Sequence, residues 1–247
     1  MITIHTIAFY LHVVVGSAAL LLFWIPMTAR KGQFNHRYFG GFYNKAMYIV
    51  AITGALMALM VLWDPMAIHG HRLSNLDNQA HFETQMRVFY SLLLYLSLLV
   101  YTGLEQGILA LQCKTSTKPL ARPQVILGNG LMVLSAPLLF WAGWQFEQTL
   151  PKVFAILGLL SGLSNLRFIF TRKPIGNRWL KEHIGAQIST AIGAYTAFLA
   201  FGGRALLSNI GEWQLAFWMA PGVIGALVIR HFTLKYANPK TQQLNKG

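Results

Sequence analysis

Residues 5–28 read HTIAFYLHVVVGSAALLLFWIPMT, an apolar run without a single Asp, Glu, Lys or Arg. An α-helix rises about 1.5 Å per residue, so a run of this length crosses about 30 Å of hydrocarbon. The first residues, MITIH, lack the Lys or Arg that begins a cleavable signal peptide, and Arg30 and Lys31 follow the run. We therefore expect a retained first transmembrane helix.

Six further apolar segments of similar length follow along the chain. Because a helix satisfies all of its own backbone hydrogen bonds, it is the structure that lipid allows for such segments. The sequence therefore predicts an all-α fold, a seven-transmembrane helix bundle in a single domain over residues 1–247. Its expected helices are about 5–28, 43–63, 85–110, 125–144, 152–171, 183–207 and 213–233.

Composition favours the membrane and excludes other classes. The 247 residues are 55% apolar and only 11% charged, whereas soluble proteins have about 25% charged residues. The net charge of +13 does not indicate nucleic-acid binding, because the 20 Lys and Arg are distributed between the apolar runs. The single Cys113 excludes an internal disulfide and a cysteine zinc motif.

The distribution of Lys and Arg predicts the orientation. Sixteen of the 20 fall on one side of the predicted bundle and four fall on the other. By the positive-inside rule, the richer side is cytoplasmic. We therefore expect a multi-pass protein of the inner (cytoplasmic) membrane, with the N-terminus outside and the C-terminus in the cytoplasm. Trp24 and Trp179 then fall near inner helix ends, at the depth that Trp prefers.

A first group of polar side chains lies toward the predicted cytoplasmic ends of helices three to six. Such side chains are costly inside a span and so indicate function. Glu105 needs a cation or a proton there, and Arg167 is the expected partner. His183 and Gln187 share one helix face, which should point into the bundle. The complete group is Glu105, Asn129, Asn165, Arg167, His183 and Gln187.

We expect this group to line a polar pocket open to the cytoplasm. Glu105, Arg167 and His183 are its candidate catalytic residues. Its candidate substrate-binding residues are Asn129, Asn165 and Gln187. The loop 36–43, with its histidine, arginine and aromatic residues, would close the pocket. The alternative is structural, with an ion pair and amide hydrogen bonds that set the register of the helices.

A second group consists of histidines on the predicted outer side. His5 and His12 are two helical turns apart on one face, and the loop after the second helix carries others. Imidazole binds zinc, copper, iron and nickel, so these histidines are candidate metal ligands. Solvated loop histidines and a hydrogen-bonded interior His12 are the alternatives. The candidate metal ligands are His5, His12, His69, His71 and His81.

Haem b is a second possible cofactor, since membrane cytochromes hold haem between histidines of facing helices. Two pairings would provide such ligands. The first joins His12 to His81, and the second joins His183 to His36 or His231.

Two motifs resemble a family of bacterial polytopic membrane proteins known as a domain of unknown function. His36-Arg37-x-x-Gly40-x-x-Tyr43 resembles its His-Arg-x-x-Gly-x-x-Tyr element. Glu182-His183-Ile184-Gly185, followed by Thr196-Ala197-Phe198, is similar to its sixth-helix motif, although Gln187 stands where the family commonly has methionine. The resemblance implies a similar helix count and no known activity. It adds weight to His36 and His183.

Three functions fit these residues. The first is a haem- or metal-dependent redox protein, with His12, His36 and His183 binding the cofactor and Glu105 handling protons. The second is a small-molecule carrier or receptor, in which Arg167 binds an anion and protonation of Glu105 or His183 gates it. The third is a non-catalytic accessory subunit of a membrane complex. We expect the lipid bilayer as a partner, together with a membrane-protein partner or a second copy of the chain.

Overall fold

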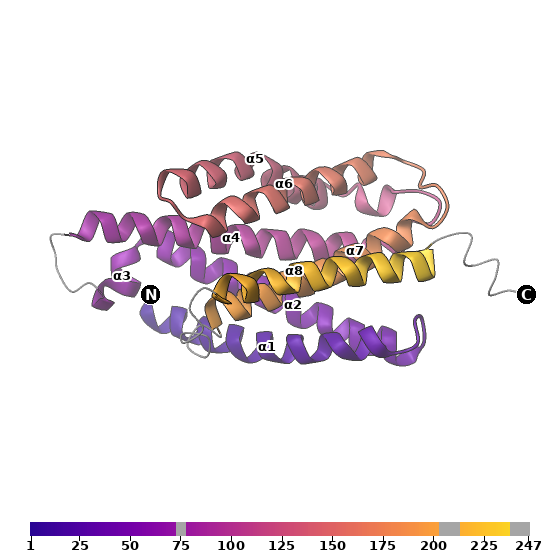
Figure 1. The fold of residues 1–247 in the computed structure, drawn as a ribbon, viewed down its shortest axis with the longest axis horizontal. Helices are drawn as coiled ribbons and strands as arrows, with labels where there is room; N and C mark the ends of the chain where they lie inside the picture. The colour runs from indigo at the N-terminus through magenta and orange to yellow at the C-terminus, as the bar shows by residue number, and fades with distance from the viewer. Residues whose placement is uncertain (73–77, 203–212, 238–247) are drawn as a thin grey trace, which may run out of the picture. The chain divides into compact units, whose positions relative to one another are not determined.

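A computed structural model describes residues 1–72, 78–202 and 213–237, and these residues are all-α, without a strand. Within them the chain forms eight α-helices, seven of at least 20 residues and one of five (Figure 1). The helices are α1 (Ile2–Thr28), α2 (Phe34–Trp63), α3 (Pro65–His69), α4 (Gln79–Ala110), α5 (Pro123–Gln145), α6 (Thr149–Phe170), α7 (Arg178–Ala197) and α8 (Trp213–Phe232). Short 3₁₀ turns η1 (Gly70–Arg72) and η3 (Lys118–Leu120) and π-turns η4 (Phe198–Gly202) and η5 (Thr233–Ala237) accompany them.

Five of the described helices are long and apolar enough to cross a membrane, namely α1, α2, α4, α5 and α6. Their outward faces carry large apolar side chains, such as Leu21, Leu134 and Leu138, which are at least 70% exposed. A lipid environment accounts for this exposure, because it does not penalise apolar surface as water does. The predicted count of seven spans stays a prediction. Residues 203–207 of the sixth expected segment lie outside the described residues.

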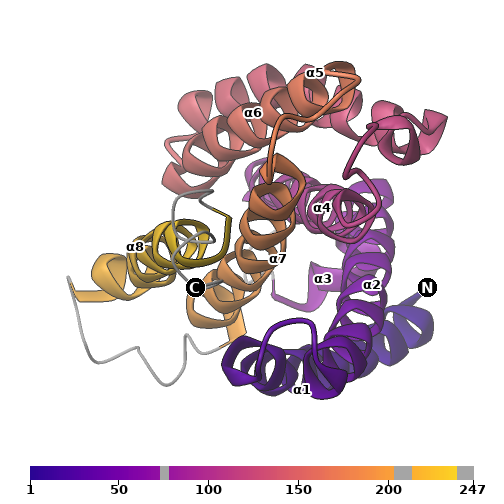
Figure 2. The ribbon, with the colours of Figure 1, turned by 90° about the vertical axis from the view of Figure 1, so that its right-hand side faces the viewer.

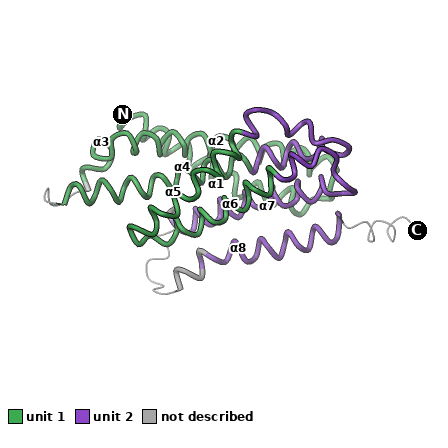
Figure 3. The backbone as a smooth tube through the Cα atoms, turned by 90° about the horizontal axis from the view of Figure 1, so that it is seen from above, with its two compact units in different colours: residues 1–102, 127–166 green, residues 103–126, 167–247 purple. Residues whose placement is uncertain are grey.

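The chain divides into two compact units (Figure 3). Unit 1 comprises residues 1–102 and 127–166, and unit 2 comprises residues 103–126 and 167–247. Helices α4, α5 and α6 each contribute to both units. Each unit is described by itself below.

Small residues set the helix packing within unit 1. Helix α1 packs along α2 (Figure 2), with Ala19 fully buried between neighbours. On α6, a Cβ added at Gly158 would lie 2.2 Å from the Tyr95 hydroxyl oxygen of α4. One turn on, a Cβ at Gly162 would lie 2.8 Å from a Val133 methyl of α5. This small-residue face therefore lets α6 approach both helices closely.

The connection between the first two helices corrects a sequence prediction. Residues 36–43, expected as a loop that closes a pocket, are helical and form the first turns of α2. A tight turn allows this early start, because Gly32 adopts the left-handed φ of +77° that favours glycine. The His36 Nδ1–H donates to the Pro26 carbonyl oxygen at 2.9 Å, and Lys31 Nζ donates to the same oxygen. His36 therefore caps the end of α1.

The connection after α2, expected as a loop that carries histidines, begins with the short helix α3. Asp64 ends α2 and caps α3, since its carboxylate accepts a hydrogen bond from the Ala67 backbone N–H at 2.8 Å. Pro65 occupies the first turn of α3, where its missing N–H costs nothing. Helix α4 then begins at Gln79, six residues before the expected start. These short-range caps bring His69 and His71 close to the membrane helices.

The close approach at Gly158 predicts a specific loss of stability. Gly158→Ala should lower the thermal midpoint of the purified protein, because overpacking a tight contact costs about 1–3 kcal/mol. Gly130→Ala on α5 is the matched control, since nothing lies within 4 Å of a Cβ added there. The control should melt at or slightly above the wild-type temperature, because alanine favours helix. A Gly158→Ala midpoint equal to that of the control would contradict the packing.

Candidate functional site

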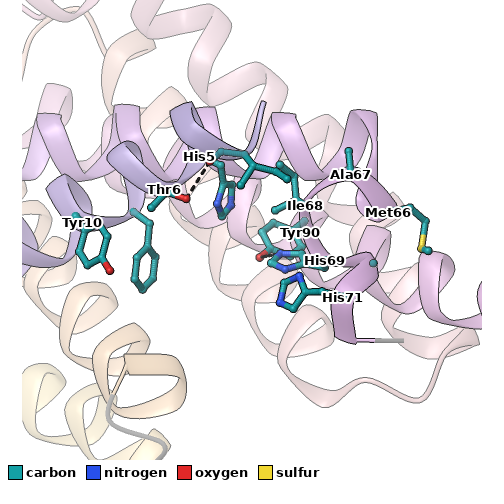
Figure 4. Close-up of a pocket in the computed structure, with 12 residues that line it drawn as sticks. His5, Thr6, Tyr10, Met66, Ala67, Ile68, His69, His71 and Tyr90 are labelled. Atoms are coloured by element: carbon teal, nitrogen blue, oxygen red, sulfur yellow. Dashed lines mark hydrogen bonds between the residues drawn. The ribbon is translucent and has the colours of Figure 1, made fainter. Parts of the chain in front are cut away.

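A pocket of about 550 Å³ lies in unit 1, where the start of α1, the segment α3–η1 and α4 meet. Its volume falls within the range of about 300–1,000 Å³ typical of small-molecule sites. Figure 4 shows the rings of His5, Tyr90, His69 and His71 grouped together, with Tyr10 on one side of the group and Met66 on the other. The complete lining is Ile2, His5, Thr6, Phe9, Tyr10, Met66, Ala67, Ile68, His69, Gly70, His71 and Tyr90.

The centre of this histidine pocket is a hydrogen-bonded pair of rings. His69 is only 5% exposed, and its Nε2 lies 2.6 Å from the Tyr90 hydroxyl oxygen. His5 meets His69 edge-on, with ring centroids 5.8 Å apart, and His71 lies beside His69 at 6.4 Å. Three of the five outer histidines singled out from the sequence therefore come together. Tyr90 completes the cluster.

The other two outer histidines do not line the pocket. His81 is exposed at the start of α4. His12 lies deeper on α1, where its Nδ1 is 3.0 Å from the Thr53 hydroxyl of α2. That hydroxyl donates its hydrogen to the Ile49 carbonyl oxygen at 2.7 Å, so it accepts from the His12 Nδ1–H. This contact agrees with the alternative interpretation of His12 as a hydrogen-bonded residue in the protein interior.

The predicted metal and haem sites find no support in the part of the chain that the structure describes. Within it, no group of three or more His, Cys, Asp or Glu side chains lies close enough to hold a metal ion. In the pocket, one histidine nitrogen is already engaged, because His69 Nε2 lies 2.6 Å from the Tyr90 hydroxyl oxygen. A metal ion at that nitrogen would have to displace the hydroxyl.

The pocket combines hydrogen-bonding groups with an apolar wall. No Asp, Glu, Lys or Arg is among its lining residues. Imidazole nitrogens and the Tyr90 hydroxyl provide hydrogen-bond donors and acceptors, while Phe9, Tyr10 and Ile2 provide an apolar wall. This arrangement suits an uncharged ring compound with one or two oxygen atoms.

A polar seam joins α4 and α7 within unit 2. The His183 Nδ1–H donates to the Gly107 carbonyl oxygen at 2.8 Å. Cβ atoms added at Gly107 and Gly103 would lie 2.7 Å from Gln187 Nε2 and 2.9 Å from Thr190 Cγ2. The face of His183, Gln187 and Thr190 thus packs against glycines of α4, as its spacing predicts. The close approach depends on those glycines.

Glu182 and Gln106 extend this seam, and sequence reasoning missed both contacts. Gln106 is fully buried, and its Nε2 donates to the Glu182 carboxylate at 3.0 Å. The Arg178 guanidinium lies 3.7 Å from the other Glu182 oxygen, one turn earlier on α7. The i,i+4 spacing of Arg178 and Glu182 was the signal available in the sequence.

The remaining residues of the predicted inner pocket fall into separate settings. In unit 1, Asn165 Nδ2 donates to Asn129 Oδ1 at 2.9 Å, and both side chains are buried. This bond joins α5 to α6 and matches the structural alternative. In unit 2, Glu105 is half-buried and Arg167 is exposed at the end of α6. The expected pairing of Glu105 with Arg167 stays a prediction.

No protein-family model, curated protein or solved structure matches the chain. The class is therefore defined by fold and composition alone: an α-helical protein with five helices suited to a lipid bilayer. The resemblance to the family of unknown function stays an expectation.

The single cysteine provides a test of unit 2. Cys113 is fully buried, and burial raises the pKa of its thiol, while a hydrogen bond involving the backbone of Leu120 opposes that rise. Less thiolate is therefore present at a given pH, and the thiolate is the reactive form. N-ethylmaleimide at pH 8 should label Cys113 slowly in the native protein and completely in denaturing detergent, as read by mass spectrometry. Thr115→Cys, at an exposed position, should react at once. Fast native labelling of Cys113 would show that the thiol is accessible.

Proposed function

We propose that this chain is an inner-membrane protein of seven spans that binds a neutral, membrane-dissolved ring compound in the histidine pocket. The proposal of a ligand depends on the 2.6 Å contact between His69 and Tyr90 inside a cavity of about 550 Å³ that no Asp, Glu, Lys or Arg lines. In the proposed orientation the N-terminus is outside, and the pocket opens at the extracytoplasmic surface of the inner membrane.

Two features support α7 and α8 as the sixth and seventh spans. Helix α7 continues into η4, so residues 178–202 exceed about 30 Å even without the first turn, and the 20 residues of α8 reach about 30 Å, at about 1.5 Å per residue. The polar face of α7 packs against Gly103 and Gly107 of α4, so those side chains need not meet lipid. The mean hydropathy of α7 does not reveal this arrangement, because it averages over all faces of the helix, including the polar face that packs against α4.

The route into the pocket favours a ligand that arrives from the bilayer. Ile2, Phe9 and Tyr10 line the pocket and are each about half exposed or more. In the proposed topology these apolar side chains face the lipid beside the opening. A compound that dissolves in lipid and carries oxygen atoms on its ring can therefore enter the pocket from the bilayer. Its oxygens can then form hydrogen bonds with His69 and Tyr90. Quinones and quinols have this chemistry.

The other functions expected from the sequence rest on weaker support. For a metal-dependent redox activity, no group of three or more His, Cys, Asp or Glu side chains that could hold a metal ion is found among the described residues. Any redox role would then depend on an organic ligand in the histidine pocket. For the expected cytoplasmic pocket, the Asn129–Asn165 bond and the contacts of Glu182 and His183 favour a structural role.

Ligand binding is tested with a short-chain quinone, decylubiquinone, added to the protein in lipid nanodiscs. Saturating ligand at about 100 times its Kd stabilises a protein by about 2.7 kcal/mol, so the thermal midpoint should rise by several degrees. Tyr90→Phe keeps the ring and removes the hydroxyl, and we expect about tenfold weaker binding, a difference of about 1.4 kcal/mol. Tyr101→Phe, on the same helix, is the matched control and should bind like the wild type.

Two outcomes would overturn the ligand proposal. One is the absence of any saturable shift with the wild-type protein. The other is an equal affinity for Tyr90→Phe and Tyr101→Phe, provided that both variants purify as monodisperse, helical proteins. His71→Ala is a second pocket variant for the case that Tyr90→Phe fails to fold.

Orientation is tested by labelling single exposed cysteines from one side of the membrane. With Cys113 replaced by Ala, Thr149→Cys at the start of α6 should react with a membrane-impermeant maleimide in intact spheroplasts. Thr115→Cys, in the connector after α4, should react only in inverted vesicles. The reverse pattern would contradict the proposed topology. Labelling of both positions from the same side would contradict the single membrane span proposed between them.

A further inference from the structure

Two connectors of unit 2 are rich in positive charge. Residues 111–122 follow α4, and residues 167–181 run from the end of α6 to the start of α7. Together they contain eight basic residues and no Asp or Glu. All are exposed except Arg178, which is half-buried. This cationic platform consists of Lys114, Lys118, Arg122, Arg167, Arg172, Lys173, Arg178 and Lys181.

The platform is held by hydrogen bonds between its two connectors. The Thr117 backbone N–H donates to the Arg172 carbonyl oxygen at 3.0 Å, and the Thr117 hydroxyl donates to the Ile169 carbonyl oxygen at 2.7 Å. Thr117 and Leu120 are buried beneath the surface. The positive charges therefore project from a fixed backbone, despite their mutual repulsion.

Aromatic contacts locate the platform at the depth of lipid headgroups. Lys114 Nζ lies 5.4 Å from the centre of the Trp179 ring, and the Arg178 guanidinium lies 5.3 Å from that of Phe168. Tryptophan prefers the interface between hydrocarbon and water. Helices α4 and α6, both suited to the membrane, end at this surface, so the cations lie where lipid phosphates lie.

An exposed apolar side chain lies in the same surface. Ile175, in the turn between α6 and α7, is 86% exposed and closely follows Arg172 and Lys173. Exposure of the apolar Ile175 side chain to water is unfavourable, whereas at a membrane this side chain can insert among acyl chains. Basic residues that flank an exposed aliphatic group fit a lipid, which has a phosphate and a hydrocarbon chain together. A soluble polyanion, which has no hydrocarbon chain, would contact only the basic residues.

We propose that the cationic platform binds the phosphate groups of anionic phospholipids. Each Lys or Arg near an anionic lipid surface contributes about 1 kcal/mol of attraction. Seven such residues, together with Arg178, which pairs with Glu182, therefore select anionic over zwitterionic lipid. This inference is independent of the ligand in the histidine pocket, because it uses only residues of unit 2.

The test compares lipid retention on the detergent-purified protein by native mass spectrometry. Equal amounts of phosphatidylglycerol and phosphatidylcholine with the same acyl chains are added. We expect at least about tenfold preference for phosphatidylglycerol, decreasing as salt increases, because exposed charges are screened. The triple variant Lys118→Gln, Arg172→Gln and Lys173→Gln should lose most of this preference. These exposed side chains can be neutralised without opening the core.

The matched control removes three exposed charges elsewhere, by Arg30→Gln, Arg37→Gln and Lys45→Gln near the α1–α2 turn. This variant should keep most of the preference. Equal losses in the two triple variants would show a general charge effect and overturn the platform. Glycerol phosphate in excess over lipid should not displace phosphatidylglycerol, and displacement would indicate a site for free phosphate. Both variants must remain monodisperse, and Lys118→Gln alone, with a smaller loss, replaces an unstable triple variant.

Discussion

Lipid offers no hydrogen-bond partner, and this constraint governs both the backbone and the polar side chains of the protein. The backbone meets it by forming helices. The embedded side chains meet it by bonding across helices, as His12 does with Thr53 and Asn165 with Asn129. In unit 2, His183 bonds to a backbone carbonyl of α4. Each of these contacts also sets the register of two helices, so polar residues whose type suggests chemistry stabilise the packing instead.

The histidine pocket differs because it lies at helix ends. There the capped α3 places the buried His69 against Tyr90 of α4, beside the pocket. In the proposed topology, water and headgroups lie near the pocket, so its polar atoms can exchange protein contacts for ligand contacts at low cost. A pocket without charged residues is also compatible with a bilayer route. The same argument separates the pocket from the cationic platform, whose charges require the headgroup region.

Sequence reasoning identified part of the candidate site by residue type. His5, His69 and His71 were singled out for their imidazoles, and they do line one pocket. Their expected metal finds no support among the described residues, because ring orientation and the bond to Tyr90 depend on contacts between distant segments. Tyr90 itself carried no sequence signal, since an interfacial tyrosine is common in membrane helices. The expected inner pocket likewise combined residues whose partners are 36 or 76 positions away in the chain.

The sequence by itself determined the helical, lipid-suited character of the chain. Apolar runs are local features, and the lipid imposes the same helix on each of them. Local rules for helix ends were less decisive, as the early starts of α2 and α4 show. Only the tertiary structure decided which side chains meet, including His69 with Tyr90 and Glu182 with Gln106. The physical reason is that a polar side chain in a membrane helix bonds to whatever the close approach of a neighbour presents, and that approach depends on distant glycines such as Gly107.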